Sequence, residues 1–357
     1  MKGKLESVLV LGLGRVGTLV GILLEKTGLH VSGADLHSKA GLPFETKEID
    51  VTDIEQVTKM MQGHDGVVSC LPYSFNLEIA NRACRHGIHY FDLTEDVPTT
   101  KQIITLSASA QAILAPQCGL APGFIGIVGA SLVEKLDKIR SLKLRVGALP
   151  QHPTGLLGYA FNWSPEGVVN EYLNDCEVIE DGVHKWVSPM EWIEKLVIHG
   201  IQLEAFTTSG GLGTMCETYL GRIENLDYKS IRYSGHVELM NFFFHELLMR
   251  EDRKMAGQIL TNAKPPVKED VVYIHASAEG WHNQDLIRDE FVKAYYPKKI
   301  GDRSWSAISW TTAASVCAIV EMVHNGSIPK KGFVKQETIP LKEFLATQNG
   351  RLFTSKA

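Results

Sequence analysis

Closely spaced cysteines are absent from this 357-residue sequence. Its six cysteines lie at positions 70, 84, 118, 176, 216 and 317, so even the nearest two are 14 residues apart. This spacing excludes C-x-x-C metal or redox motifs and does not resemble a disulfide framework. We therefore expect reduced cysteines in a cytoplasmic protein, and we expect no metal site.

Long hydrophobic runs and blocks of one charge are also absent. The longest apolar candidate, residues 112–133, is interrupted by Pro116, Gln117 and Pro122, so we expect no membrane span. Arg15 interrupts the N-terminal apolar stretch, and no small-residue cleavage site follows it, which argues against a secretory signal. The net charge is only −5 and contains no basic block, so nothing favours nucleic acid as a partner.

The first part of the chain alternates apolar strand patterns with amphipathic helix patterns. The expected strands cover residues 8–11, 30–35, 44–50, 65–72, 88–94 and 112–117. Alternation of this kind predicts a parallel sheet with right-handed crossovers. We expect an α/β protein whose N-terminal domain is a doubly wound Rossmann sheet.

A glycine-rich turn joins the first expected strand to the first expected helix. Gly12, Gly14 and Gly17 have G-x-G-x-x-G spacing, and Arg15 and Val16 lie at the start of the helix. In this setting the first glycine allows a tight turn, the second lets a pyrophosphate approach the backbone, and the third lets the helix pack on the strand. The unpaired N–H groups of the helix start favour the phosphates, so these five residues are candidates for binding a dinucleotide.

Asp35 ends the second expected strand, 18 residues after Gly17. A carboxylate here can accept hydrogen bonds from the adenosine ribose hydroxyls and would repel a 2′-phosphate, so NAD is favoured over NADP. Lys39 and His37 lie nearby and weaken that preference. The alternative is that Asp35 only caps a loop.

The carboxyl ends of the other strands supply the remaining candidates in this domain, because ligands of doubly wound sheets bind at that edge. Asp92 and Glu95 are candidate general bases near the nicotinamide, and the alternative for either one alone is a solvated carboxylate. The further residues expected to contact the cofactor are Cys70, Leu71, Pro72 and Thr94.

The pattern changes after about residue 118, where several strands follow one another with few helices between them. A hairpin is expected to turn at Asp181-Gly182, and an apolar helix at 310–326 is expected to return to the first domain. We therefore expect a Rossmann domain at 1–118, a substrate and dimerisation domain with a mostly antiparallel sheet at 119–306, and a returning C-terminal part at 307–357.

The second domain offers its own polar and aromatic candidates. Arg232 could clamp a carboxylate, and His236 could act as an acid or base, although a solvated arginine and a histidine in a first helical turn are the alternatives. Trp163 could form a pocket wall or pack in the core. The candidate hydroxyl donors that follow a strand are Thr207, Thr208 and Ser209.

Several motifs together resemble the saccharopine dehydrogenase family and, within it, the lysine 6-dehydrogenase group. They are GLGRVG, DLTED, CGLAPGF, GYAFNWSPEGVVNEY, LEAFTTSGG and IRYSGH. The resemblance implies a second domain like the C-terminal part of glyceraldehyde-3-phosphate dehydrogenase and a homodimer. It also implies an enzyme that uses NAD or NADP to interconvert amines and imines of amino acids.

Three functions stay open at this point. The first is oxidative deamination of the ε-amine of lysine, and the second is a saccharopine-type or carboxy(nor)spermidine dehydrogenase-type reaction. The second needs several cations for several carboxylates, and only Arg145, Arg222 and Arg232 are obvious arginine candidates. The third is a regulatory protein that binds a dinucleotide without catalysis, because the fold alone does not establish activity.

Overall fold

The computed structural model describes residues 4–37, 39–329 and 331–354. It divides into two compact units: unit 1 contains the chain up to Ile127 and again from Ser309, and unit 2 contains Val128–Ile308. The expected boundary after residue 118 stays a prediction, and the division into compact units falls after Ile127. Phe124, at the start of helix α5 (Phe124–Val133), stacks on Phe353 of the C-terminal segment with ring centroids 4.1 Å apart.

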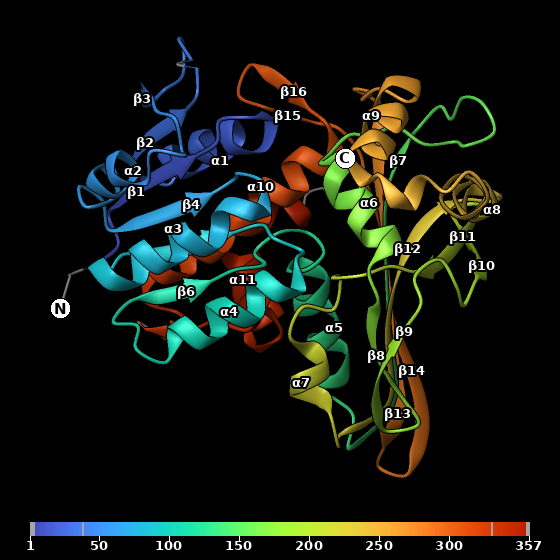
Figure 1. Cartoon of the computed structure of the whole chain (residues 1–357). Coiled ribbons are helices and arrows are strands. Elements are labelled where there is room, and N and C mark those ends of the chain that lie inside the picture. Colours follow the sequence, from blue (N-terminus) through green and yellow to red (C-terminus); the bar gives the residue numbers. More distant parts are fainter. Residues whose placement is uncertain (1–3, 38, 330, 355–357) are drawn as a thin grey trace. The chain divides into compact units, whose positions relative to one another are not determined.

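The sheet of unit 1 has seven strands in the order β17-β6-β5-β4-β1-β2-β3 (Figure 1). Every neighbouring pair in it is parallel. The chain starts in the middle, and β1 pairs with β2 on one side and β4 on the other, which confirms the expected doubly wound Rossmann sheet. The strands are β1 (Ser7–Leu11), β2 (His30–Asp35), β3 (Glu45–Glu48), β4 (Gly66–Ser69), β5 (His89–Asp92), β6 (Ile113–Ala115) and β17 (Gly332–Phe333).

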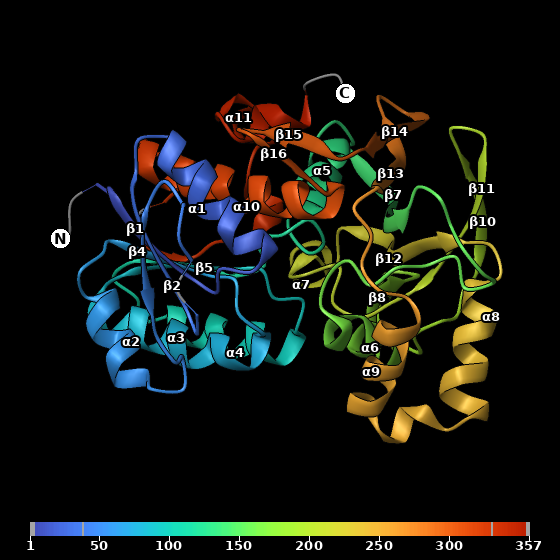
Figure 2. The ribbon, with the colours of Figure 1, turned by 90° about the horizontal axis from the view of Figure 1, so that it is seen from above.

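Helices cover both faces of this sheet. Figure 2 shows α2, α3 and α4 on one face and α1, α10 and α11 on the other. Leu9, Val67 and Tyr90 are fully buried beneath the first group. The helices are α1 (Arg15–Lys26), α2 (Ile54–Met61), α3 (Tyr73–His86), α4 (Val97–Ser107), α5 (Phe124–Val133), α10 (Ala307–Asn325) and α11 (Leu341–Ala346), with 3-10 turns at Gln336–Thr338 and Gly350–Phe353.

Helix α10 is long and apolar enough to cross a membrane by length and composition alone. However, 78% of its apolar window is buried, and Cys317 donates to the carbonyl of Val20 in α1. These contacts identify α10 as a core helix of unit 1.

Unit 2 is built on an eight-stranded mixed sheet, in which the central pair β12–β7 is parallel and the other pairs are antiparallel. This confirms the expected second, mostly antiparallel sheet. The path β10-β11-β12-β7-β13-β14 carries the hairpin β8–β9 at its side. The strands are β7 (Lys138–Pro150), β8 (Cys176–Glu180), β9 (Val183–Val187), β10 (Glu194–Ile198), β11 (Ile201–Thr207), β12 (Ile223–Tyr233), β13 (Asp270–His282) and β14 (Asp285–Tyr295), with a separate pair β15 (Lys298–Ile300) and β16 (Arg303–Trp305).

Local sequence explains the turn of the hairpin β8–β9 and the start of helix α6 (Pro165–Leu173). The hairpin β8–β9 turns at Asp181 and Gly182, whose φ values of 52° and 77° are those of a tight hairpin turn. Ser164 accepts a hydrogen bond from Gly167 N–H and so begins α6. The helices are α6 (Pro165–Leu173), α7 (Met215–Tyr219), α8 (His236–Asn241) and α9 (Arg253–Ala263), with a π-helical turn at Phe242–Glu246 and a 3-10 turn at Met249–Glu251.

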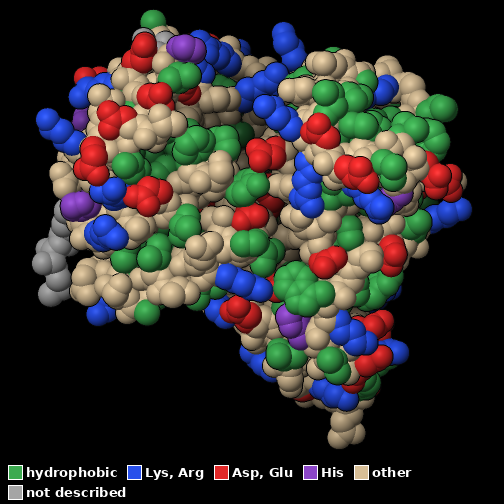
Figure 3. Space-filling model, in the orientation of Figure 1, with side chains coloured by type: hydrophobic (Ala, Val, Ile, Leu, Met, Phe, Trp, Pro, Cys, Tyr) green, Lys and Arg blue, Asp and Glu red, His purple; other side chains and the backbone are tan. Residues whose placement is uncertain are grey.

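The surface of the described residues mixes both signs of charge. On the face seen in Figure 3, acidic and basic side chains are interspersed over each unit. This agrees with the small net charge of −5.

Candidate functional site

The glycine turn of unit 1 has room for a side chain at one of its three glycines and not at the other two. A side chain at Gly17 would collide with the Gly12 carbonyl, and one at Gly12 would lie 3.0 Å from the Cys70 carbonyl. A side chain at Gly14 would meet nothing within 4 Å. The backbone at Gly14 is therefore open in the way that the approach of a pyrophosphate requires.

The start of α1 adds hydrogen-bond donors at this position. The first helical hydrogen bond runs from Thr18 N–H to Gly14 O at 3.0 Å, so the N–H groups of Arg15, Val16 and Gly17 precede the helical ladder. Such groups, together with the helix dipole, suit phosphates. The residues present therefore fit a dinucleotide.

The turn after β4 lies directly against the glycine turn. Besides the Cys70 carbonyl, the Leu71 side chain would meet a Cβ at Gly12, and the Cys70 Cβ would meet one at Gly17. Burial and the nearby Asp92 raise the pKa of Cys70 to about 12, so it stays a thiol. Pro72 then caps α3. The structure thus brings Cys70 and Leu71 beside the glycines, and Pro72 follows them at the start of α3.

Asp92 ends β5 and is completely buried. Its carboxylate accepts hydrogen bonds from the Tyr90 hydroxyl at 2.6 Å, from Thr94 N–H at 3.0 Å and from Gln117 N–H at 2.9 Å. Burial raises the pKa of Asp92 to about 6, while these three donors oppose the shift. Because the Asp92 carboxylate accepts hydrogen bonds from residues that follow both β5 and β6, it holds the ends of these two strands together.

Thr94 and Glu95 follow Asp92 in the turn before α4. Thr94 is buried, and its hydroxyl accepts a hydrogen bond from Asp96 N–H at 3.1 Å. Asp96 in turn begins α4 by accepting from Thr99 N–H at 2.8 Å. Glu95 is half-buried between these fixed neighbours, at the carboxyl edge of the sheet.

Asp35 and Lys39 both bind the backbone of Leu13 in the glycine turn. The Asp35 carboxylate accepts from Leu13 N–H at 2.6 Å, and the Lys39 ammonium donates to the Leu13 carbonyl. The end of β2 therefore presents an acidic and a basic group at the same residue. Sequence reasoning identified the first and treated the second only as a source of doubt.

Arg232 is the central polar group of unit 2. It is 3% exposed, and its guanidinium lies 4.8 Å from the ring centroid of Tyr159 and 5.5 Å from that of Tyr172. Its Nε donates to the Tyr172 hydroxyl at 2.6 Å, and Nη2 lies 3.8 Å from Glu171. Burial alone would lower the pKa of Arg232, but the tyrosines and Glu171 outweigh it and raise that pKa.

His236 belongs to the same cluster and is neutral. Its Nδ1 lies 2.9 Å from the Leu157 carbonyl, which can only accept, so Nδ1 carries the proton. Its Nε2 therefore accepts from the Tyr172 hydroxyl at 3.0 Å. Burial and the charge of Arg232 lower the pKa of His236 to about 3. With both nitrogens occupied, His236 is arranged to orient Tyr172, which favours the structural alternative over an acid–base role.

The three expected hydroxyl donors separate in the structure. Thr207 pairs with Lys229 in the sheet and Glu204 with Arg232, so Thr207 and Arg232 point to opposite faces. Thr208 lies on the Arg232 side, where its hydroxyl is 2.8 Å from that of Ser230.

The other two candidates of this unit have structural contacts. Ser209 donates to the Asp175 carbonyl at 2.9 Å, and Trp163 is half-buried against the hydrophobic core. Of the nominated substrate residues, Thr208 shares the face of the sheet that carries Arg232, and Trp163 packs against the core cluster that contains Tyr159 and Tyr172.

A hollow of about 370 Å³ lies on the opposite face of the sheet, and sequence reasoning did not find it. Arg145 is 1% exposed there and binds Glu194 and Asp227, the latter at 2.7 Å, while Lys229 lies 3.0 Å from Glu194. Although burial opposes ionisation, Arg145 and Lys229 lower the pKa of Glu194 to about 2. The pairing of Arg145 here means that it does not share a site with Arg232.

A nucleotide-binding Rossmann unit followed by a unit with a mixed sheet is the architecture of many dehydrogenases. Residues 8–115 match the family model "Saccharopine dehydrogenase NADP binding domain", and residues 119–351 match "Saccharopine dehydrogenase C-terminal domain". The chain therefore belongs to the saccharopine dehydrogenase family, as its motifs predicted.

Curated relatives agree with this assignment. The "Saccharopine dehydrogenase [NADP(+), L-glutamate-forming]" of Schizosaccharomyces pombe is 27% identical over 140 residues, which cover 38% of this chain and 31% of the relative. The protein of the same name from Saccharomyces cerevisiae is 21% identical over 273 residues, which cover 73% and 60%. The matches thus span between about a third and three fifths of these relatives. The resemblance to the lysine 6-dehydrogenase group stays a prediction.

Solved structures share the fold. The apo saccharopine dehydrogenase (L-Glu forming) from Saccharomyces cerevisiae has a TM-score of 0.74 and 18% identity, covering 96% of this chain and 97% of that one. The C. glutamicum DAP dehydrogenase in complex with DAP has a TM-score of 0.52 and 10% identity, covering 99% and 100%. At these identities the likeness concerns the fold alone.

Proposed function

We propose that this protein is an NAD(P)-dependent dehydrogenase that oxidises the carbon of a C–N bond in a saccharopine-like substrate, a secondary amine joining two amino acids. The matches of both units to saccharopine dehydrogenase models support this reaction class. The structural observation that supports an amino-acid substrate is Arg232, a buried cation held between the rings of Tyr159 and Tyr172. A guanidinium in such a setting suits a carboxylate.

The residues of unit 1 would hold the dinucleotide, which accepts a hydride when bound. The open backbone at Gly14 and the N–H groups of Arg15 and Val16 would hold its pyrophosphate. Glu95, half-buried at the carboxyl edge, is the candidate to remove the amine proton. Asp92 supports it from the buried end of β5 through the hydrogen bond to Thr94.

The substrate chemistry would need the oxidised dinucleotide as hydride acceptor, a base for the proton, and water. Loss of a proton from the amine and of a hydride from its carbon leaves an imine. Water then cleaves the imine to an aldehyde and an amine. The amine released identifies the substrate: an amino acid from a secondary amine, or ammonia from a primary one.

Deamination of the ε-amine of lysine is the second candidate, and one observation favours it. A saccharopine-like substrate carries several carboxylates, whereas lysine carries one. Arg145 is paired on the opposite face of the sheet from Arg232, and Arg222 is exposed and stacks on Tyr219. Of the three arginines named from the sequence, only Arg232 lies against Tyr159 and Tyr172.

We propose NAD as the preferred cofactor because the Asp35 carboxylate lies at the expected ribose position. The relatives named above carry NADP(+) in their names, and Lys39 lies beside Asp35, so use of NADP is the competing proposal. The homodimer and the cytoplasmic setting stay predictions.

The reaction class is tested by identifying the released amine. The full chain is incubated with saccharopine or with L-lysine, each with NAD⁺ or NADP⁺, and glutamate and ammonia are quantified. Glutamate from saccharopine supports the main proposal, and ammonia from lysine supports the second. Formation of neither amine, while a dinucleotide still binds, would contradict both.

A further inference from the structure

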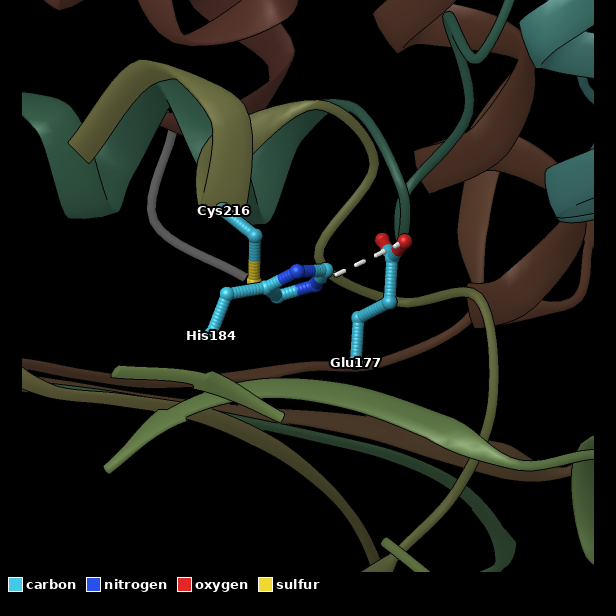
Figure 4. Close-up of side chains that lie close together, drawn as sticks. All are labelled: Glu177, His184 and Cys216. Atoms are coloured by element: carbon cyan, nitrogen blue, oxygen red, sulfur yellow. Dashed lines mark ion pairs between the residues drawn. The ribbon is translucent and has the colours of Figure 1, made fainter. Parts of the chain in front are cut away.

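Three side chains with different metal-binding atoms converge at the edge of unit 2. Glu177 is on β8, His184 is on β9 and Cys216 is on α7. One carboxylate oxygen, one imidazole nitrogen and the thiol sulfur all lie within 4.8 Å of one another. Figure 4 shows the three side chains pointing toward one another, with the ion pair between His184 and Glu177 marked.

The register of the hairpin places two of them on one face. Ile179 lies opposite His184, and Glu177 lies opposite Trp186. Directly opposed residues of an antiparallel pair share a face, as do residues two apart on a strand. Glu177 and His184 therefore point to the same side of the hairpin, and Cys216 reaches that side from α7. Cys176, the neighbour of Glu177 on β8, points to the other side.

This set of atoms matches the coordination chemistry of zinc. Thiolate, imidazole and carboxylate are its usual protein ligands, at distances of about 2.0 to 2.3 Å, so ligand atoms on one ion are about 3.3 to 3.7 Å apart. His184 Nε2 already lies 3.8 Å from Glu177 Oε1. Side-chain movements of about 1 Å would bring all three atoms into range.

We propose that Glu177, His184 and Cys216 bind one zinc-like divalent cation. One thiolate and one carboxylate balance its charge, and the fourth tetrahedral position is open to water. The spacing of the cysteines predicted no metal site, whereas these ligands come from three separate elements.

The position of the cluster indicates what the ion would do. In the described part of the chain, the hairpin β8–β9 joins the main sheet through the register pair Leu226–Ile179, and Gly182 N–H at its turn donates to the Glu224 carbonyl at 2.8 Å. A cation shared by both hairpin strands and α7 would attach it. It would also stabilise the loop that leads from Thr208 and Ser209 into α7.

The test uses the full chain and a metal alone. The purified protein is stripped with a chelator, loaded with Zn²⁺ or Co²⁺ and freed of excess ion, and the retained metal is measured by elemental analysis. Co²⁺ additionally reports a bound thiolate and tetrahedral geometry by its absorption spectrum. The cluster variants are Cys216→Ala, His184→Asn and Glu177→Gln, and the matched control is Cys176→Ala.

We expect one equivalent of metal per chain, a thiolate-to-cobalt absorption band and a higher Tm with Zn²⁺. All three effects are lost in Cys216→Ala and His184→Asn and kept in Cys176→Ala. Glu177→Gln keeps the shape of the side chain but removes its charge, so it should also lose metal retention. This variant tests the proposal if another cluster variant does not fold. No retained metal in the wild-type chain, or equal retention by folded cluster variants, would overturn the proposal.

Discussion

The Nε of Arg232 donates a hydrogen bond to the hydroxyl of Tyr172 over 2.6 Å. The same hydroxyl donates to His236 Nε2, which is neutral and anchored to the Leu157 carbonyl. Tyr172 thus connects a buried cation to a fixed acceptor, and the guanidinium cannot rotate without breaking this chain of bonds.

Tyr172→Phe should therefore disorder Arg232 while leaving the aromatic packing in place. We expect KM for the amino-acid substrate to rise about tenfold, equivalent to about 1.4 kcal/mol, and KM for the dinucleotide to stay constant. Steady-state kinetics with each substrate varied in turn measures both. Equal changes in the two constants would show a general loss of structure and contradict a positioning role.

Gly14 and Gly17 provide a matched pair of substitutions in the dinucleotide turn. Gly14→Val adds a side chain where nothing lies within 4 Å, so the protein should fold and lose dinucleotide binding. Gly17→Ala places a Cβ against the Gly12 carbonyl, so it should destabilise unit 1. Circular dichroism and titration with NADH separate the two outcomes. Full dinucleotide binding by a folded Gly14→Val would place the pyrophosphate elsewhere.

The buried Asp92 predicts a pH dependence of stability. Its pKa is raised from 3.8 to about 6 in the folded state, so the unfolded chain loses this proton first as pH rises. The free energy of unfolding should therefore fall between about pH 4 and pH 6, by at most about 3 kcal/mol, and then level off. Asp92→Asn should remove this component.

Urea unfolding of the wild type and of Asp92→Asn at pH 4 and pH 7 tests this pH dependence of stability. The wild type should exceed the variant in stability by more at pH 4 than at pH 7. A difference that is constant with pH, or larger at pH 7, would mean that Asp92 is ionised in the folded protein throughout.

The pair Asp35 and Lys39 sets the expected cofactor preference. Asp35→Ala removes the carboxylate at the ribose position and should lower the ratio of kcat/KM for NAD⁺ to that for NADP⁺ about tenfold. Lys39→Ala should move the ratio in the opposite direction, because it removes the nearby cation. Both variants are assayed with each dinucleotide at fixed substrate. Unchanged ratios would place the specificity outside this strand end.

The Rossmann sheet was predictable because its signals are local. A buried strand, a spaced set of glycines and a following helix sit within a few residues, and β2 was predicted to the residue. The convergence of Cys70 and Leu71 on Gly12 follows from the strand order, because β4 and β1 are neighbours in such a sheet.

The remaining features depend on contacts between distant residues. Arg145 and Glu194 are on strands that are far apart in the sequence, and only the folded sheet shows that they pair on the face opposite Arg232. Burial and the charge of Arg232 keep His236 neutral, and Leu157 and Tyr172 fix which ring nitrogen carries its proton. No local pattern connects Leu157 or Tyr172 to His236. The cluster of Glu177, His184 and Cys216 likewise has no spacing that a motif would detect.

The most direct test of the central claim is formation of reduced dinucleotide by the wild-type chain, followed by absorbance, with saccharopine or L-lysine and NAD⁺ or NADP⁺. The account predicts reduction with saccharopine, and a strong loss of it in Arg232→Lys without loss of dinucleotide binding. No reduction with either amine, or full activity in Arg232→Lys, would contradict the proposed function.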